Sequence, residues 1–368
     1  MKKQHIKHLG ILALLIVIAI AGYFTFNTNT SVSNMTHLDT SLKTNDYVLS
    51  EDNFEAQMLE IVEPYIASVT TSGYFKSNDD TDLYYEYYTT PSAKGNIVVS
   101  HGFTESLEKY TELAYYFLKE GFNVYLIDHR GHGLSERTTS DLSLVDVKSF
   151  DNYINDLYTF INEFITSKQE DLPLFLFAHS MGGGIGTGLL ETYPDLFDAA
   201  VLSSPMLGIN LGSVPKFAAN IISNTATLLG QGSQYVISHA PFNLEDETFD
   251  ASSSSSLARF NYYLNKKINN EHLQTSGASY SWLKESLSAT RNMIKPENLK
   301  RITTPILLFQ SENDSLVLPE PQYALVNNVP SAELIFVPGA KHELFSTPNE
   351  LFIPYLNTVL DFYKSHIE

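Results

Sequence analysis

Three residue types that together perform nucleophilic catalysis occur at informative places in this sequence, and the first is Ser180. It lies in the segment Ala178-His179-Ser180-Met181-Gly182, after the apolar run 173–177 and before a glycine-containing helical pattern. This context is typical of a nucleophile elbow, in which a strained strand-to-helix turn exposes the serine hydroxyl and small neighbours let the strand and helix approach. Ala178 departs from the usual G-x-S-x-G form by one methyl group. We expect Ser180 to act as a nucleophile.

A serine hydroxyl is a weak nucleophile at neutral pH and needs a general base, which an acid must orient. Asp314 follows the apolar run 305–310, and His342 lies in the loop after the apolar run 333–337. The chain order serine, acid, histidine is the one that a large group of α/β enzymes uses. We therefore predict Asp314 as the acid and His342 as the base, with Glu312 as a rival for the acid.

Acyl transfer also needs hydrogen-bond donors for the negative charge of its tetrahedral intermediate. The segment His101-Gly102-Phe103 follows the apolar run 97–100, where a loop of this kind supplies one backbone N–H; the residue after the nucleophile supplies another. We predict the N–H groups of Phe103 and Met181 as this oxyanion hole. We expect His101 to support the loop by hydrogen bonding, and the segment 128–133 to form a rigid turn that frames the site.

The elements that must hold these residues follow from an alternation of strand-type and helix-type patterns. Short apolar runs bounded by turn residues occur at 96–100, 123–127, 172–178, 199–203, 305–310 and 333–337. Helical spacing between several of these runs indicates a parallel sheet that is covered on both faces. We predict an α/β-hydrolase fold with a mostly parallel eight-stranded sheet, a core of residues 46–205 and 299–368, and a helical cap or lid at 206–298.

Composition removes several classes of function. The formal net charge of −19 argues against a nucleic-acid partner, since such binding depends on clustered Lys and Arg. The chain has no cysteine, and it contains no phosphate-binding glycine loop with lysine, no H-E-x-x-H pair and no nicotinamide fingerprint. We therefore expect no metal and no other cofactor, and we predict no obligatory protein partner.

The N-terminal segment points to a membrane. Lys2, Lys3 and Lys7 precede an uncharged stretch at 9–26, which is about the minimum length for a membrane-spanning helix. The lysines predict a cytoplasmic N-terminus, so residues 1–26 would anchor a single-pass protein whose catalytic part lies outside the cell membrane. Residues 27–45, rich in Asn, Thr and Ser, are expected to form a flexible tether. Secretion after cleavage of a signal peptide is the alternative.

The motifs together give the sequence a family resemblance. Residues 101–103, 128–133 and 178–183, with Asp314 and His342, resemble those of the bacterial lysophospholipase and monoacylglycerol lipase family of serine aminopeptidase-like hydrolases. The resemblance runs from about Asp82 to the C-terminus. Three cap segments, 257–260, 277–280 and 281–285, are also similar to that family. The resemblance implies a lid over the nucleophile and a channel for one acyl chain.

The expected activity is hydrolysis of the carboxylic ester of a single-acyl lipid, a monoacylglycerol or a lysophospholipid, through an acyl-enzyme intermediate. Trp282, Phe217 and Leu228 are candidates for the apolar wall that binds the acyl chain, and Ile221, Ile222 and Leu229 are further candidates. A serine aminopeptidase, a short-chain carboxylesterase and a non-catalytic binding module on the same fold remain as alternatives.

Overall fold

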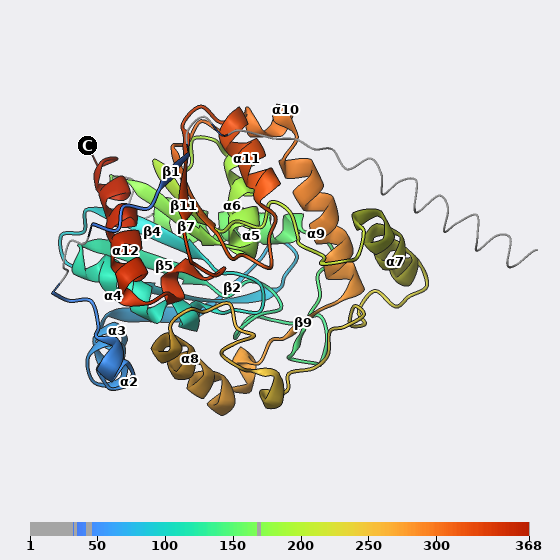
Figure 1. Ribbon diagram of the computed structural model, residues 1–368, viewed down its shortest axis with the longest axis horizontal. Helices are drawn as coiled ribbons and strands as arrows, with labels where there is room; N and C mark the ends of the chain where they lie inside the picture. Colours follow the sequence, from blue (N-terminus) through green and yellow to red (C-terminus); the bar gives the residue numbers. More distant parts are fainter. Residues whose placement is uncertain (1–31, 33–34, 42–45, 168–170, 368) are drawn as a thin grey trace, which may run out of the picture. The chain divides into compact units, whose positions relative to one another are not determined.

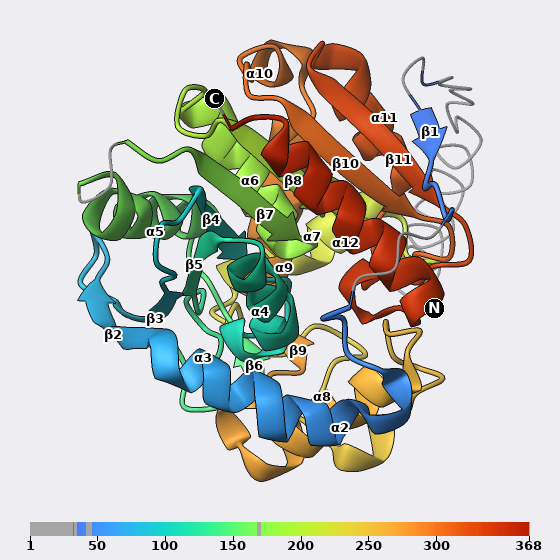
Figure 2. The same ribbon diagram turned by 90° about the vertical axis from the view of Figure 1, so that its left-hand side faces the viewer.

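The computed structural model describes residues 32, 35–41, 46–167 and 171–367. Within these residues the main sheet has nine strands in the order β1-β11-β10-β8-β7-β4-β5-β3-β2 (Figures 1 and 2). Its strands are β1 Met35–His37, β2 Thr70–Lys76, β3 Asp82–Tyr88, β4 Gly95–Ser100, β5 Phe122–Ile127, β7 Leu174–His179, β8 Ala199–Ser203, β10 Ile306–Ser311 and β11 Ala332–Val337. A second sheet pairs β6 Leu144–Val145 with β9 Gly277–Ala278.

The helices alternate with the strands along most of the described chain. They are α2 Phe54–Gln57, α3 Glu63–Val69, α4 Thr111–Lys119, α5 Asp151–Ile161, α6 Met181–Thr192, α7 Lys216–Leu228, α8 Leu257–Asn269, α9 Tyr280–Met293, α10 Pro296–Leu299, α11 Pro319–Asn328 and α12 Asn349–Lys364. Shorter helical turns are η1 Glu51–Asn53, η2 Met58–Val62, η3 Leu107–Tyr110, η4 Asn162–Thr166, η5 Leu244–Asp246, η6 Glu271–Leu273 and η7 Leu344–Ser346.

The sheet is mostly parallel, which confirms the predicted α/β-hydrolase fold. All six apolar runs form strands, and β4, β5, β7, β8 and β10 are buried at every residue, as strands covered on both faces must be. Among the described strands of this sheet, β3 alone runs opposite to the others, antiparallel to its neighbours β2 and β5. The predicted strand number of eight is wrong for the described chain, because β1 adds a ninth strand that pairs in parallel with β11.

Helices cover both faces of the sheet. Alternate residues of β7 point in opposite directions, so Phe175 and Phe177 join the hydrophobic core under α4 and α12, which Figure 2 shows in front of the sheet. Leu176 points the other way, and its side chain lies beside Gly186 of α6. The helix α5 packs on α6 at that second face. The loops after β4, β7, β10 and β11 leave the sheet at its carboxyl edge, where ligand sites of such sheets form.

The predicted cap, residues 206–298, lies between β8 and β10 and contains α7, α8 and α9. The pairing of β9 with β6 fastens one end of this segment to the core, and the Asp146 carboxylate accepts a hydrogen bond of 2.6 Å from Ser279 Oγ. A second link joins α8 to α4, because the guanidinium of Arg259 donates two hydrogen bonds of 2.8 Å to Glu112. The serine tract 252–256 is a loop whose final residue caps α8.

The N-terminal predictions meet the structure only in part. Residues 1–26, the expected anchor, lie outside the described residues, as does most of the expected tether. The described part of that tether is not without structure, because Met35–His37 forms β1 through backbone pairing with β11, which needs no apolar pattern. Among the helices that the structure describes, none is both long and apolar enough to cross a membrane.

Candidate active site

Ser180 lies at the end of β7, immediately before α6. Its backbone has φ 52° and ψ −118°, in the positive-φ region that residues with side chains rarely adopt. The Ser180 N–H donates to the Ser203 carbonyl at 3.1 Å, and the Ser180 carbonyl accepts from the Met206 N–H at 2.7 Å. A Cβ at Gly182 would collide with the Ser100 carbonyl oxygen, so glycine is required there. The local geometry is that of a nucleophile elbow.

The methyl group of Ala178 fits this crowded turn. Ala178 is fully buried, and a Cβ built at Gly186 on the facing helix would lie 3.3 Å from the Ala178 Cβ. The same Cβ would lie 2.8 Å from Leu176 Cδ2. Because Gly186 has no side chain, the departure from G-x-S-x-G is accommodated without moving the strand.

His342 and Asp314 are brought together from the loops after β11 and β10. The distance between His342 Nδ1 and Asp314 Oδ2 is 2.6 Å, and Asp314 Oδ1 accepts from the N–H groups of Leu316 and Val317 at 2.9 and 3.0 Å. Burial alone would raise the pKa of Asp314, but the hydrogen bond and charge of His342 hold that pKa below its ordinary value. His342 Nε2 is buried and has no hydrogen-bond partner among the described residues.

The rival acid is occupied elsewhere. Glu312 Oε2 accepts from the Gly339 N–H at 2.8 Å and so closes the turn that leads to His342. A second imidazole supports the other side of His342, because the His179 ring lies 4.7 Å from it between ring centroids. Burial lowers the pKa of His179 to about 3, so this ring is neutral at physiological pH. The arrangement gives His342 one charged partner, Asp314.

In the predicted oxyanion loop, hydrogen bonds hold both the N–H and the C=O of Gly102. The His129 N–H donates to His101 Nε2 at 2.9 Å, so the proton of this neutral imidazole is on Nδ1, which donates to the Gly102 carbonyl at 2.8 Å. The Gly102 N–H donates to Glu105 Oε2 at 2.7 Å. In a trans peptide the C=O and the following N–H point in opposite directions. The His101 hydrogen bond therefore fixes the direction of the Phe103 N–H.

The second predicted donor, Met181, is the first residue of α6. Backbone N–H groups in the first turn of a helix lack an intrahelical acceptor, and the helix dipole adds partial positive charge there. Burial lowers the pKa of His101 to about 4, so the imidazole that holds the Gly102 carbonyl is neutral at physiological pH. Acyl transfer requires N–H donors of this kind for its oxyanion.

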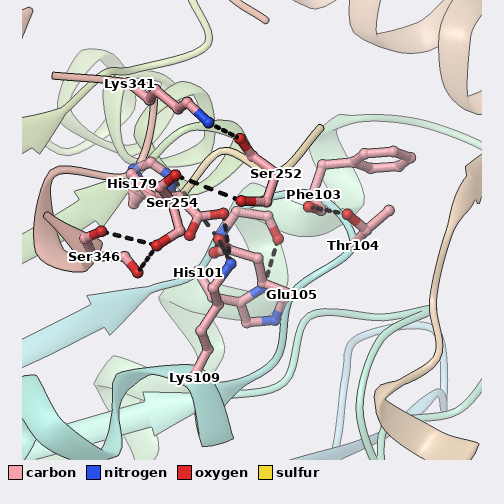
Figure 3. A network of polar contacts seen from close by, with 12 residues as sticks. His101, Phe103, Thr104, Glu105, Lys109, His179, Ser252, Ser254, Lys341 and Ser346 are labelled. Atoms are coloured by element: carbon pink, nitrogen blue, oxygen red, sulfur yellow. Dashed lines mark hydrogen bonds and ion pairs between the residues drawn. The ribbon is translucent and has the colours of Figure 1, made fainter. Parts of the chain in front are cut away.

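A buried chain of charges joins the oxyanion loop to the histidine loop. Lys109 Nζ lies 3.0 Å from Glu105 Oε1 and 2.6 Å from Glu343 Oε1, and Glu343 directly follows His342. Burial opposes the charge of Lys109, but the two carboxylates hold its pKa above the ordinary value. Figure 3 shows Glu105 and Lys109 beside His101, with the serine loop of the cap and Lys341 facing them. This network leaves no local signal in the sequence, because its members are up to 234 positions apart.

Ser180, His342 and Phe103 line one cavity of about 760 Å³. The rest of its wall is mainly apolar and comes from the cap and the loops after β8 and β10; it includes Met206, Ile209, Leu211, Val214, Ala219, Ile222, Val236, Ile237, Ala278, Trp282, Leu283, Leu316 and Val317. The Trp282 ring packs on the Phe103 ring with centroids 4.2 Å apart. The structure therefore places the serine, the imidazole, the oxyanion loop and one predicted apolar residue around a common space.

Four of the six predicted cap residues lie elsewhere. Phe217 and Leu228 do not line the cavity, and their side chains are 41% and 87% exposed. Ile221 and Leu229, the further candidates, are also exposed and outside the lining. The buried face of α7 carries Ala219, Ser223 and Ala226, at helical spacing. Residue type alone cannot tell which of several apolar residues on one short helix turn inward, and Ile222 of the same helix lines the cavity.

The chain is similar to proteins that are already known. A family model described as serine aminopeptidase, S33, matches residues 91–349. The chain is similar to lysophospholipase L2 of Escherichia coli strain K12, with 29% identity over 313 residues that cover 79% of this chain and 87% of the relative. It is also similar to the monoacylglycerol lipase of Mycolicibacterium smegmatis, with 25% identity over 82% of this chain and all of the relative.

Solved structures resemble the fold. A soluble variant of monoglyceride lipase from Saccharomyces cerevisiae, solved with a substrate analogue, superposes with a TM-score of 0.66 at 19% identity and covers 82% of this chain and 96% of its own. A thermostable carboxyl esterase from Bacillus coagulans, solved with glycerol, gives a TM-score of 0.67 at 19% identity. At this level of identity the likeness concerns the arrangement of the sheet and helices.

Proposed function

The chain belongs to the serine aminopeptidase, S33, family of α/β hydrolases, and from that premise we propose that it hydrolyses the carboxylic ester of single-acyl lipids. Monoacylglycerols and lysophospholipids are the two substrate classes that the names of its relatives suggest. One observation carries the proposal above the others. The elbow serine and the imidazole bonded to Asp314 open into a cavity of about 760 Å³ with a mainly apolar wall.

The reaction proceeds by two acyl transfers. His342 Nε2 takes the proton of the Ser180 hydroxyl as Oγ attacks the ester carbonyl, and the Phe103 and Met181 N–H groups hold the oxyanion. The imidazolium then gives its proton to the departing alcohol as the ester C–O bond breaks. Water, deprotonated by His342, attacks the acyl-serine and releases the fatty acid. Asp314 keeps the imidazole in the tautomer that has its free lone pair on Nε2.

The apolar wall supplies the binding energy for the acyl chain. Each methylene group removed from water contributes about 0.8 kcal/mol, so a long chain that reaches the cap residues gains several kcal/mol over acetate. A short-chain esterase would not use this wall. We therefore expect the rate at low substrate concentration to rise with acyl length until the chain fills the cavity.

The test is fatty-acid release by the purified full-length chain in detergent, with monooleoylglycerol and oleoyl-lysophosphatidylcholine as substrates and Ser180→Ala as the blank. We expect release that depends on Ser180. If Ser180 reacts with a fluorophosphonate probe but neither lipid is cleaved, the lipid proposal is wrong. Cleavage of peptides at their amino terminus would then indicate an aminopeptidase, and cleavage of acetate esters a short-chain esterase.

We further propose that residues 1–26 hold the enzyme at a cell membrane with its catalytic part outside. Support comes from the uncharged stretch after Lys2, Lys3 and Lys7. Membrane fractionation of cells that express the full chain, with protease added outside, provides the measurement. Recovery of the enzyme in the medium, shortened at its N-terminus, would indicate secretion instead.

A further inference from the structure

A second, polar pocket adjoins the catalytic cavity. It has a volume of about 220 Å³ and shares Thr104, Lys109, Ser253, Ser276 and Glu343 with the wall of that cavity. A water molecule takes about 30 Å³ in the liquid, so the pocket has room for a group of glycerol size. When the acyl chain of an ester lies along the apolar wall, the alcohol part of the ester needs a different place. This pocket offers it a polar space beside the oxyanion loop.

The cations of the pocket are already neutralised. Lys109 contacts both Glu105 and Glu343, and Lys267 Nζ lies 2.7 Å from Glu247 Oε1. The remaining cation, Arg259, donates both of its closest bonds to Glu112. Three positive charges therefore meet four carboxylates. The cations that line the pocket therefore leave no surplus positive charge for a phosphate. Lys341, which is not part of the lining, donates to the backbone carbonyls of Phe249, Asp250 and Ser252.

The pocket is also rich in hydrogen-bond acceptors. Ser276 Oγ donates its proton to the Ala240 carbonyl, which leaves this hydroxyl oxygen as an acceptor. The carboxylates of Glu343 and Glu247 are acceptors as well. A phosphodiester has only acceptor oxygens and is negatively charged, whereas a polyol carries O–H donors. The lining is therefore complementary to hydroxyl groups.

Two buried hydroxyl groups of the lining, those of Thr275 and Tyr263, lack a hydrogen-bond partner among the described residues. The Thr275 side chain lines the pocket and is 2% exposed, and its Oγ1 has no hydrogen-bond partner in the described part of the chain. An unpaired buried hydroxyl is costly, so an occupant that pairs with it is favoured. This observation, independent of the charges, points to a ligand in the pocket.

We propose that this pocket binds the leaving alcohol as an uncharged polyol, and that Glu247 and Glu343 exclude anionic head groups. The proposal rests on the proposed function and deepens it, because it selects monoacylglycerols over lysophospholipids. Glu343 and Glu247 act through charge on the head group and on the lysines, and the apolar cavity continues to bind the acyl chain.

The test compares kcat/KM of the full-length enzyme for monooleoylglycerol, oleoyl-lysophosphatidylglycerol and oleoyl-lysophosphatidylcholine, which share one acyl chain. We expect the monoacylglycerol value to exceed both phospholipid values at least about tenfold, a ratio equal to 1.4 kcal/mol. Equal or faster cleavage of either phospholipid would overturn the inference and leave the proposed function intact. Absence of cleavage of all three, with Ser180 still labelled by fluorophosphonate, would instead remove the proposed function, and the inference with it.

A charge variant separates selectivity from folding. Glu247→Gln frees Lys267, so we expect the ratio of lysophosphatidylglycerol to monoacylglycerol kcat/KM to rise about threefold to tenfold. Glu245→Gln, which removes an equal charge two residues earlier at an exposed position, is the matched control and should leave the ratio unchanged. If both variants change the ratio equally, general surface charge explains the selectivity and the pocket does not.

Discussion

The two walls of the catalytic cavity differ in how they are held. The wall formed by the sheet loops is tied by short hydrogen bonds, such as the 2.6 Å contact between His342 and Asp314 and the clamp on Gly102. The cap wall is tied to the core by polar links away from the reacting groups, such as the bond of Ser279 to Asp146, and its helix α7 leaves Phe217 and Leu228 exposed. The core wall carries the candidate catalytic residues, whereas most of the apolar lining comes from the cap wall. Substitutions in the two walls should therefore have effects of different size and kind.

The largest effect is expected from Asp314→Asn. An amide would favour the wrong tautomer of His342 and could not balance the imidazolium, so kcat should fall about 10⁴-fold. Steady-state hydrolysis of a soluble ester provides the measurement. Glu312→Gln, two residues away and bonded only to the Gly339 N–H, should keep kcat within a few-fold. A comparable loss in both variants would show that the whole loop, and not the acid, had been disturbed.

A smaller and more selective effect is expected from Trp282→Ala in the cap wall. Its ring packs on Phe103 and lines the cavity, so kcat/KM for monooleoylglycerol should fall about 10-fold to 100-fold, or ~1.4–3 kcal/mol. Hydrolysis of an acetate ester, which does not reach the wall, should change much less. Leu228→Ala, at an exposed position of the same cap, is the control and should be near neutral. Equal loss for both esters would assign Trp282 to support of the oxyanion loop.

The smallest expected effect is on thermal stability, and it comes from Glu191 near the C-terminal end of α6. Burial raises the pKa of Glu191 to about 8, and its Oε1 has no hydrogen-bond partner among the described residues. The unfolded chain ionises this group near pH 4, so Glu191 costs the folded state stability as pH rises from about 4 to 8. Glu191→Gln should raise Tm by a few degrees at pH 8 and leave it unchanged at pH 4. A Tm gain that is independent of pH would rule out this origin.

The contrast between the walls also explains what could be read from the sequence. Strand-type runs followed by Gly102, Ser180, Asp314 and His342 are local signals, and parallel strands bring their ends together at one edge. The sequence therefore predicted the α/β-hydrolase fold and the residues that meet there. It did not reveal that α7 turns Phe217 outward, since that depends on the packing of α7 against α9. Nor could it pair Lys109 with Glu343 across 234 positions.

The pairing of β1 with β11 could not be predicted from the sequence either. Met35–His37 alternates no hydrophobic residues, yet it forms β1 along residues Leu334–Phe336 of β11. The six apolar strands were predicted because burial on both faces selects β-branched, aliphatic and aromatic residues. An edge strand carries no such requirement, so its sequence leaves no signal.

That edge strand also bears on self-association. The N–H and C=O groups of a sheet's last strand are a template for any other chain in an extended conformation. In this protein the three-residue β1 covers part of the six-residue β11 and so leaves a shorter edge, and the Leu38 N–H adds a further bond of 2.9 Å to the Phe336 carbonyl. A truncation that removes residues 35–38 would leave that template open. Such a shortened protein should be more prone to aggregate than one that begins before Met35, even though both retain every catalytic group.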